Sequence, residues 1–412
     1  MKRLIILLAL CAGLAACNNK ETPDDGTGNP FAPITLTKAE LTVANTANAF
    51  AFDAYKALYK DEQMLFSPFS LSMALSMTAC GANGATAEDM ATVLGFENQS
   101  VEDIAGYYNK MVGSLTTVDK KTTFECANSV WIDEGFPVRN DFLATASDYF
   151  AAEAISAKFA DPATINAVNK WCSDKTHGKI PKMLEKLSPE TVMLLINALY
   201  FNGKWAFEFN SKTNKEKFKT IDGNKVNVNM MSTSRTMSYS NVDGWEMVHL
   251  RYGNGAFAMD VILPPADMAF GTAAASFDYD RFCSLVQAYD AYDVTLKMPE
   301  FKFEYSVDGL KDALIALGMK SAFTPYVADF SKMADIPIGD AFYIGDVKQK
   351  TYIDVNTKGT EAAAVTVVSM ESISAYFPPE PKDVSFTADR PFFFIIREMS
   401  TGSILFIGQK VK

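Results

Sequence analysis

The stretch at residues 357–379 reads TKGTEAAAVTVVSMESISAYFPP and joins two kinds of sequence that do not suit one ordinary element. After Gly359, its first half consists of small and β-branched residues, which favour a strand. Its second half ends in Pro378 and Pro379, which favour an extended and exposed chain. The stretch therefore predicts a loop that can also become a strand.

Alternate positions of this stretch differ in character. On the two-residue period of a strand, one face carries no charge and no large side chain, and it consists of Thr360, Ala362, Ala364, Thr366 and Val368. The opposite face includes Glu361. A charge on the first face would be buried without a partner if the segment entered a sheet. The pattern indicates a segment that lies in water in one state and inserts between existing strands in another.

Short apolar runs beyond this stretch predict strands. The runs at 392–396 and 404–407 flank a turn at 400–402, and they predict a hairpin buried on both faces. Further strands are predicted earlier in the chain, at 193–201, 256–263 and 294–298.

Helix signals lie mainly in the first half. Ser67 is an N-cap before Pro68, and Gly81 is the matching stop. A capping-box pattern from Thr86 to Asp89 predicts that the next helix starts there.

Two more helices are predicted at 165–176 and 310–317. His177, at the end of the first of these, is interpreted as a partner of the helix dipole. Because helices gather early and antiparallel strands late, the sequence predicts the α+β class.

The composition favours one large domain without a nucleic-acid partner. The 412 residues carry a net charge of −11, 48% of them are hydrophobic, and no run rich in lysine or arginine occurs. No linker or repeat follows residue 36, so residues 36–412 are predicted to form a single domain.

The N-terminus predicts export. Lys2 and Arg3 precede an apolar run that is too short to span a bilayer, so residues 1–16 are interpreted as a signal peptide. Small residues before Cys17 resemble the bacterial lipoprotein box, which implies lipidation of Cys17 and a flexible tether over residues 17–35. The alternative is an ordinary signal peptide with a chance cysteine. The expected location is a bacterial membrane, with the domain periplasmic or at the cell surface.

Cysteine and histidine usage argues against metal, cofactor and hydrolase chemistry. Cys80, Cys126, Cys172 and Cys283 stand in apolar contexts with irregular spacing, which favours free thiols. His177 and His249 are the only histidines, and neither belongs to a catalytic motif. The glycine pattern at 253–255 precedes a strand rather than a helix and is interpreted as a turn.

The run GTEAAA, formed by Gly359, Thr360, Glu361, Ala362, Ala363 and Ala364, resembles the hinge of inhibitory serpins. Six further matches lie in serpin order along the chain, at 66–70 with 81–82, 128–131, 171–180, 197–205, 296–301 and 388–392. The resemblance implies a monomer with three β-sheets, eight or nine helices and an exposed reactive-centre loop at about 357–381.

The resemblance also implies a mechanism. A target serine protease attacks a loop carbonyl and forms an acyl-enzyme. The cut loop then enters the sheet as a new strand, and the attached protease is deformed so that deacylation stalls. The chain itself would contribute no catalytic group, which makes it a serine-type endopeptidase inhibitor and not an enzyme.

The hinge departs from the family pattern at two positions. Thr357 stands where inhibitory members usually carry an acidic residue, and Val365 is bulkier than the usual residue at the end of the alanine run. The alternatives are therefore a non-inhibitory serpin that acts as a surface binding or carrier protein and, from another class, a hydrolase.

Three ways of counting place the scissile bond differently within the window from Met370 to Phe377. The spacing from the hinge gives Ile373–Ser374, which is the first choice, and the other counts give Ala375 and Phe377, with Tyr376 between them.

No lysine or arginine lies between residues 361 and 379, so the acidic specificity pocket of a trypsin-like protease finds no cation there. The expected targets are elastase-, chymotrypsin- or subtilisin-like serine proteases, with papain-like cysteine proteases as a lesser possibility.

Overall fold

The computed structural model describes residues 32–188, 191–336, 340–360 and 382–412. Helices in this part of the chain are α2 (Lys38–Leu58), α3 (Pro68–Cys80), α4 (Gly84–Leu94), α5 (Val101–Leu115), α6 (Asn140–Phe150), α7 (Ala163–Lys175), α8 (Phe270–Ser276), α9 (Tyr279–Gln287), α10 (Leu310–Leu317) and the short 3₁₀ helix η2 (Ser321–Phe323).

The strands fall into two hydrogen-bonded groups. The first comprises β2 (Thr122–Asp133), β3 (Glu153–Ala157), β4 (Met193–Lys204), β10 (Phe301–Ser306), β11 (Asp346–Asn356) and β12 (Gly359–Thr360). The second comprises β1 (Met64–Phe66), β5 (Asn214–Lys219), β6 (Lys225–Val242), β7 (Trp245–Tyr252), β8 (Phe257–Leu263), β9 (Asp290–Pro299), β13 (Lys382–Thr387), β14 (Phe392–Glu398) and β15 (Ile404–Lys410).

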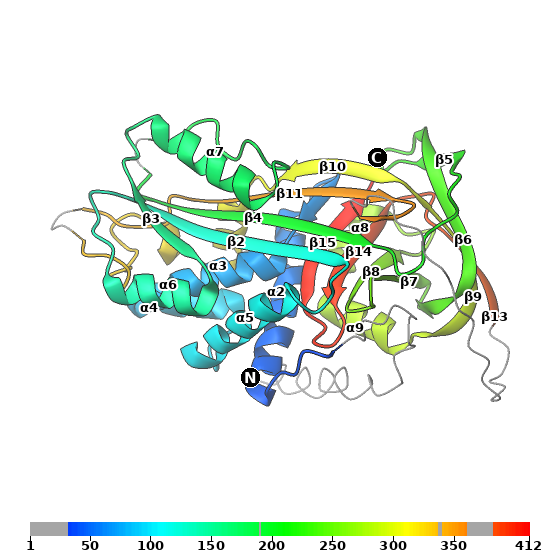
Figure 1. The fold of residues 1–412 in the computed structure, drawn as a ribbon, viewed down its shortest axis with the longest axis horizontal. Helices are drawn as coiled ribbons and strands as arrows, with labels where there is room; N and C mark the ends of the chain where they lie inside the picture. Colours follow the sequence, from blue (N-terminus) through cyan, green and yellow to red (C-terminus); the bar gives the residue numbers. More distant parts are fainter. Residues whose placement is uncertain (1–31, 189–190, 337–339, 361–381) are drawn as a thin grey trace.

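The six-stranded sheet has the order β10-β11-β12-β4-β2-β3 and runs along the length of the molecule (Figure 1). Strand β4 is buried along most of its length because its two faces meet different layers. Leu194, Ile196 and Ala198 belong to the small cluster under α7, whereas Met193 and Leu195 belong to the main core. This burial explains why β4 is an almost continuous apolar run.

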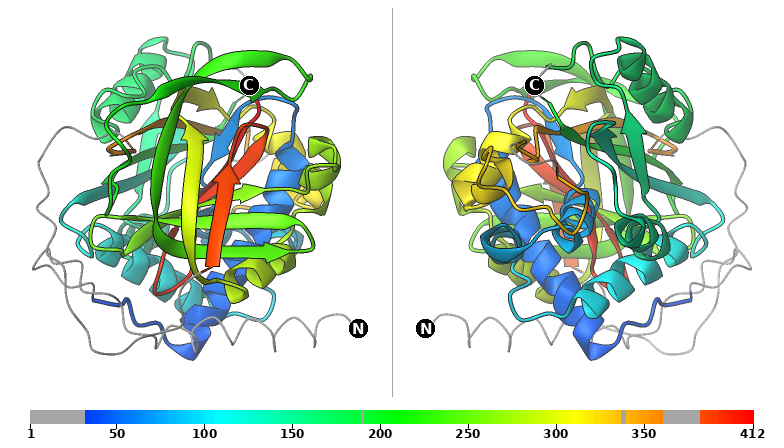
Figure 2. Two further views of the ribbon diagram at one scale, coloured as in Figure 1. Left: turned by 90° about the vertical axis from the view of Figure 1, so that its right-hand side faces the viewer. Right: turned by 90° about the vertical axis from the view of Figure 1, so that its left-hand side faces the viewer.

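The nine-stranded sheet divides into two parts at β6. Residues 239–242 of this strand pair with β7, whereas residues 230–239 pair with β9. One continuous strand of 18 residues therefore serves both parts, and Figure 2 shows the two parts from the ends of the molecule. Together with the six-stranded sheet, the two parts make the three sheets that were expected.

Several sequence predictions are confirmed at the level of single residues. Helix α3 begins after Ser67, whose Oγ accepts from Ser70 N at 3.3 Å, and its C-cap is Gly81. Strands β14 and β15 form the predicted hairpin, and every residue in both is buried. The α+β class is confirmed, with nine α-helices in the part of the chain that the structure describes.

Two local predictions were wrong. Helix α4 begins at Gly84 rather than after Thr86, because the Thr86 hydroxyl accepts from Asp329 N at 3.0 Å and does not cap the helix. His177 lies beyond the end of α7, and its Nε2 is 2.8 Å from Glu125 Oε2 on β2. Its partner is a carboxylate and not the helix dipole.

The strand arrangement is also less uniform than the sequence predicts. The pairs β2–β3, β4–β11 and β9–β13 are parallel, so the strands are not all antiparallel. Long strands such as β2 also occur in the first half of the chain.

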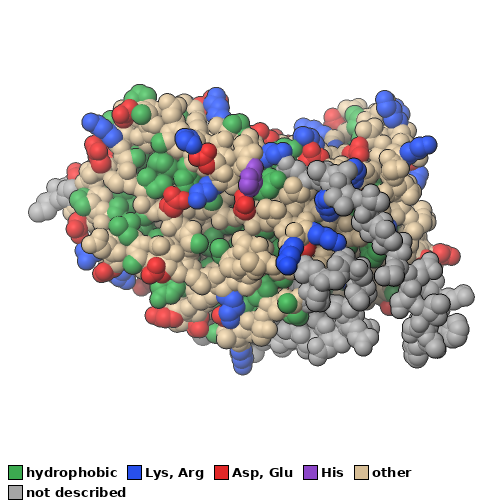
Figure 3. All heavy atoms as spheres, in the orientation of Figure 1, with side chains coloured by type: hydrophobic (Ala, Val, Ile, Leu, Met, Phe, Trp, Pro, Cys, Tyr) green, Lys and Arg blue, Asp and Glu red, His purple; other side chains and the backbone are tan. Residues whose placement is uncertain are grey.

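The four cysteines at positions 80, 126, 172 and 283 are free thiols, as predicted. Among the described helices, none combines the length and the hydropathy needed to cross a bilayer. On the face shown in Figure 3, acidic and basic side chains are interspersed with apolar ones.

Candidate functional site

The two-residue strand β12 lies between two longer strands of the six-stranded sheet. Thr360 pairs with Val355 of β11 on one side and with Gly203 of β4 on the other, and both pairings are antiparallel. The first two residues of the GTEAAA run are thus already part of the sheet, while residues 361–364 lie outside the described residues.

Gly359 allows this close approach of backbones. Its φ of 153° is unfavourable for a residue with a side chain. A Cβ atom at this position would lie 2.2 Å from the carbonyl oxygen of Gly203 and 2.7 Å from the Cα of Lys204. Both atoms belong to the backbone and cannot move aside cheaply, so only glycine fits here.

Thr360 is 1% exposed and fixed by one hydroxyl contact. Its Oγ1 lies 2.6 Å from the phenolic oxygen of Tyr252, a buried residue of β7. The Tyr252 ring stacks on Trp205, with ring centroids 4.4 Å apart and an angle of 14° between the planes. Burial raises the pKa of Tyr252 well above its ordinary value, so the phenol stays neutral and available for this hydrogen bond.

Trp205 also holds the chain that leads into β12. Its backbone N–H donates to Lys358 O and its indole Nε1–H donates to Asn356 O, both at 2.9 Å. The backbone N–H of Phe209 donates to Thr357 O at 3.0 Å. Thr357 is therefore held through its carbonyl oxygen, which every residue type provides. We name Gly203, Trp205, Tyr252, Gly359 and Thr360 the β12 seat.

Beyond the β12 seat, β4 and β11 pair directly. Their parallel register runs from the pair of Leu194 with Asp346 to the pair of Ala198 with Lys350. A strand can therefore enter between β4 and β11 at the β12 end without breaking a pair, whereas a longer insertion has to separate this five-residue register.

Buried polar side chains lie at the directly paired end. We name Ser67, Ser70, Asn128, Asn197 and Gln349 the polar cluster; all five are buried.

Gln349 on β11 links this cluster to β4 and to the start of α3. Its Oε1 accepts from Ser67 N at 2.8 Å, and its Nε2 donates to Ser67 O at 3.0 Å and to Asn197 Oδ1 at 2.7 Å. Asn197 in turn donates to Ser70 and Asn128.

The remaining predicted site residues belong to two segments that the structure does not describe. Cys17, the hinge residues Glu361, Ala362, Ala363 and Ala364, and the window from Met370 to Phe377 with Ile373–Ser374 all lie outside the described residues.

Sequence reasoning missed Tyr252 and Gln349. Neither lies in a recognisable motif, and each reaches its partner from a distant part of the chain. Trp205 and Asn197 did lie in the matched run at 197–205, which was the available signal.

The sheet thus holds Gly359 and Thr360 between β4 and β11 at one end and a buried polar cluster at the other. The family model described as Serpin (serine protease inhibitor) matches residues 45–412. The chain belongs to the serpin family.

Relatives and solved structures agree with this family. An uncharacterized serpin-like protein of Methanosarcina mazei is 31% identical over 379 residues, covering 89% of this chain and 86% of the relative. The native structure of the thermophilic serpin tengpin has a TM-score of 0.82 at 32% identity and covers 93% of this chain and 97% of its own. Human thyroxine-binding globulin has a TM-score of 0.80 at 25% identity, with coverages of 91% and 99%. The family and the fold suggest protease inhibition rather than enzymatic activity.

Proposed function

We propose that this chain is an inhibitory serpin that traps non-tryptic serine proteases by loop insertion. The observation that supports this most is the position of β12, which pairs with both β4 and β11 while those strands still pair directly beyond it. Thr360 is buried between these strands, which is where the first residue of an inserting hinge has to lie.

In the proposed reaction, the protease serine attacks the carbonyl carbon of the residue before the scissile bond, with Ile373–Ser374 as first choice. The carbon–nitrogen bond breaks, the new amine takes a proton from the protease's own general acid, and an ester joins the protease to the loop. The freed loop then extends β12 between β4 and β11, so that the direct register of these strands opens. The protease is carried with the loop, and hydrolysis of the ester stalls.

The specificity proposal rests on the sequence of the loop. Because residues 361–379 contain no lysine or arginine, a trypsin-like pocket with a buried carboxylate would lose its ion pair. Val, Met, Ile, Ala, Tyr and Phe are available instead, and they suit the apolar pockets of elastase-, chymotrypsin- and subtilisin-like enzymes. Papain-like cysteine proteases are a lesser candidate for the same reason.

The direct test is incubation with chymotrypsin, elastase, subtilisin and trypsin, followed by denaturing electrophoresis. We expect a covalent complex with at least one of the first three and none with trypsin. Mass spectrometry of the released peptide then locates the scissile bond. Efficient trapping of trypsin would contradict the specificity, and cleavage without any complex would contradict inhibition.

A variant at Thr360 tests the insertion step separately. Thr360→Arg would place a charge in the buried β12 seat at a cost of several kcal/mol, so the protein should be cut without trapping. Thr360→Ser keeps the hydroxyl that meets Tyr252 and is the matched control. An unchanged complex yield for Thr360→Arg would rule out insertion through this seat.

The alternative is a non-inhibitory serpin that serves as a surface binding or carrier protein. Thr357 at the start of the hinge favours it, and one structural relative is named for the binding of thyroxine. Under this alternative, chymotrypsin, elastase or subtilisin would cut the loop, and none of them would form a covalent complex.

We propose further that Cys17 carries a lipid anchor and that residues 17–35 form a tether, which would place the domain at a bacterial membrane, periplasmic or at the cell surface. The support is the sequence before Cys17 and the polar composition after it. Several acyl chains on one cysteine give stable anchoring, because each buried methylene contributes about 0.8 kcal/mol. Recovery of Cys17→Ser in the membrane fraction at the wild-type level would contradict the anchor.

A further inference from the structure

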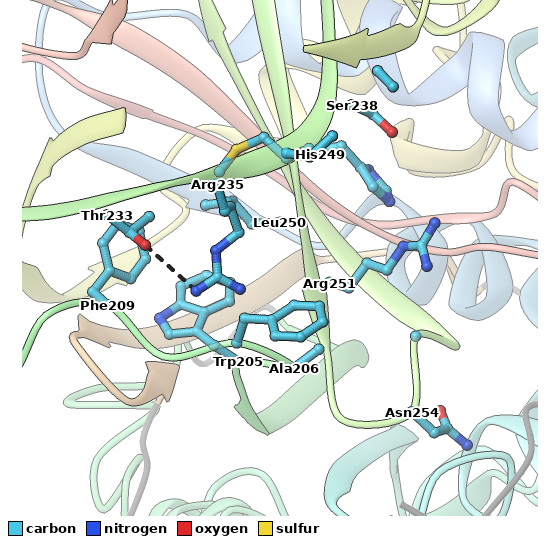
Figure 4. A pocket seen from close by; sticks show the side chains of 15 residues that line it. Trp205, Ala206, Phe209, Thr233, Arg235, Ser238, His249, Leu250, Arg251 and Asn254 are labelled. Atoms are coloured by element: carbon cyan, nitrogen blue, oxygen red, sulfur yellow. Dashed lines mark hydrogen bonds between the residues drawn. The ribbon is translucent and has the colours of Figure 1, made fainter. Parts of the chain in front are cut away.

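A pocket lies next to the β12 seat, between β6, β7 and the chain that follows β4. It has a volume of about 310 Å³, which is enough for a small organic molecule. Its apolar wall includes Trp205, Phe207, Phe209 and Leu250. Figure 4 shows Arg235 on the side of Trp205 and Phe209, and Arg251 on the side of His249.

The charge of the pocket is opposite to that of the chain. Among its fifteen lining residues there are two arginines but no aspartate or glutamate, although the whole chain carries a net charge of −11. Such a local concentration of cationic groups attracts an anion.

Neither arginine forms an ion pair with a carboxylate of the described residues. The guanidinium of Arg235 donates only weakly, to Glu208 O at 3.3 Å and to Thr233 Oγ1 at 3.4 Å, and it lies 4.5 Å from the ring centroid of Phe207. The guanidinium of Arg251 makes no hydrogen bond or ion pair within the part of the chain that the structure describes, and burial lowers its pKa. Both groups are therefore free to bind an anion.

His249 supplies a second, independent indication of a ligand. The residue is 7% exposed, and its Nδ1 lies 2.6 Å from Asp260 Oδ1. Its other ring nitrogen, Nε2, is buried and has no hydrogen-bond partner among the residues that the structure describes. Because burial lowers the pKa of His249, the ring is neutral, with the proton on Nδ1 facing Asp260 and a lone pair on Nε2. An unpaired buried acceptor requires a donor.

We propose that this pocket binds a small aromatic carboxylate that also carries a hydroxyl group. The carboxylate would pair with Arg251, the hydroxyl would donate to His249 Nε2, and the ring would pack on the apolar wall beside Arg235. The carboxylate, the hydroxyl and the ring of the ligand would thus contact a guanidinium, the unpaired His249 nitrogen and the apolar wall, respectively.

The pocket shares two residues with the chain segment that leads into β12. Trp205 and Phe209 line the pocket, and both also hold residues 356–358 through hydrogen bonds. A ligand packed on Trp205 would stabilise these contacts and so alter the ease of insertion. This regulatory consequence rests on the proposed inhibitory function, whereas binding itself does not.

Isothermal titration calorimetry with hydroxynaphthoate tests the proposal. Naphthoate lacks the hydroxyl and naphthol lacks the carboxylate, so they are matched probes of the two polar contacts. We expect one hydroxynaphthoate per chain and about tenfold weaker binding of each truncated probe, as for the loss of a charge-assisted or buried hydrogen bond. Hydrogen exchange of the Trp205 amide should slow when the ligand is bound.

Variants identify the site. Arg251→Met removes the charge while keeping the length of the side chain, and it should weaken hydroxynaphthoate binding by about tenfold or more. Arg281→Met is the control, because Arg281 lies on α9 and pairs with Asp243 at 2.7 Å. Absence of binding to the wild-type protein, equal affinity for naphthol, or equal affinity of Arg251→Met would each overturn the proposal. Calorimetry without protease separates the two proposals, since binding of hydroxynaphthoate requires no loop insertion and would persist if the protease panel gave no covalent complex.

Discussion

The two ends of the gap between β4 and β11 are built in different ways. At one end, the β12 seat relies on backbone pairing, two glycines and a stack of aromatic rings. At the other end, the polar cluster joins β4, β11 and the start of α3 through amide and hydroxyl side chains. In the proposed mechanism, the β12 seat accepts the inserting strand by its shape, whereas the polar cluster resists the separation of β4 and β11. Entry of the inserting strand and resistance to strand separation would therefore depend on different residues.

The largest effect on trapping is expected for Gly359→Ala, which tests the shape of the seat. The new methyl group would overlap Gly203 O and Lys204 Cα, so β12 should leave the sheet. An added cost of only about 1.4 kcal/mol slows insertion tenfold, and the covalent complex should fall by about that factor or more. Faster hydrogen exchange at Thr360 provides a second measurement that needs no protease. Gly223→Ala is the control, because Gly223 has a φ of 83° but no atom within 4 Å of the added group. An equal loss of covalent complex in both variants would show that backbone strain in general, and not the shape of the seat, causes the effect.

Gln349→Ala tests the opposite end and should lower global stability. Ser67 N would lose its acceptor and Asn197 Oδ1 a donor, both in a buried environment. We expect a loss of about 2–4 kcal/mol in the free energy of unfolding, measured by urea denaturation. Gln287→Ala changes an exposed glutamine on α9 and should stay within about 0.5 kcal/mol. A loss no greater than that of the control would mean that the polar cluster does not hold β4 and β11 together.

Acidification should destabilise the structure around the β12 seat and leave the polar cluster unaffected. His249 lies three residues before Tyr252 on β7, and it faces Asp260, Arg397, Arg251 and Tyr289. Burial lowers the pKa of His249 below its unfolded value, so the unfolded chain binds the proton more readily. Stability should therefore fall as pH drops below about 6.5.

The buried pair formed by Asp260 and Arg397 responds only at lower pH. Burial alone would raise the pKa of Asp260, but Arg397 and His249 hold it well below its usual range, so its contribution is lost only below about pH 4. The polar cluster contains no titratable side chain, and burial raises the pKa of the adjacent Cys126 to about 12. Melting curves of the wild-type protein and His249→Gln between about pH 7 and about pH 5 provide the measurement. Equal slopes for the two proteins would contradict the assignment to His249.

The smallest effect is expected for Tyr252→Phe, which removes one hydroxyl from the seat and keeps the ring stack. Loss of the hydrogen bond to Thr360 should cost about 1 kcal/mol. Tyr107→Phe removes a comparable buried hydroxyl that lies 2.8 Å from Ser403 Oγ, remote from the seat, and should cost about as much. Only Tyr252→Phe should accelerate hydrogen exchange at Thr360, and equal exchange in both variants would show that this hydroxyl does not fix β12.

Local signals in the sequence predicted local structure well. Ser67 and Gly81 mark the ends of α3 because caps depend on neighbouring residues, and the apolar runs of β14 and β15 predict a buried hairpin for the same reason. Thr86 was misread because its hydroxyl binds Asp329, 243 residues away. A capping pattern alone cannot show that a distant backbone amide takes the hydroxyl instead.

The candidate site was predictable only in part. The run at 359–364 was recognisable because alternation of side chains is a local property, and the structure places its first two residues, Gly359 and Thr360, in the sheet. The seat itself depends on Tyr252 and Thr360, which are 108 residues apart, and Gln349 and Asn197 are separated by 152. Such pairings follow from strand register in the folded chain, and no spacing in the sequence encodes them.

The position of β12 means that the nucleus of an inserted strand is already formed. Adding a strand to a sheet is slow at first, because chain entropy is lost before many hydrogen bonds form in return. Here the nucleus already exists, since Gly359 and Thr360 pair with strands on both sides. In the proposed mechanism, cleavage therefore starts growth without a lag. Whether the ester is hydrolysed first then depends on the rate at which the inserted strand grows, and not on the time needed to form its first hydrogen bonds.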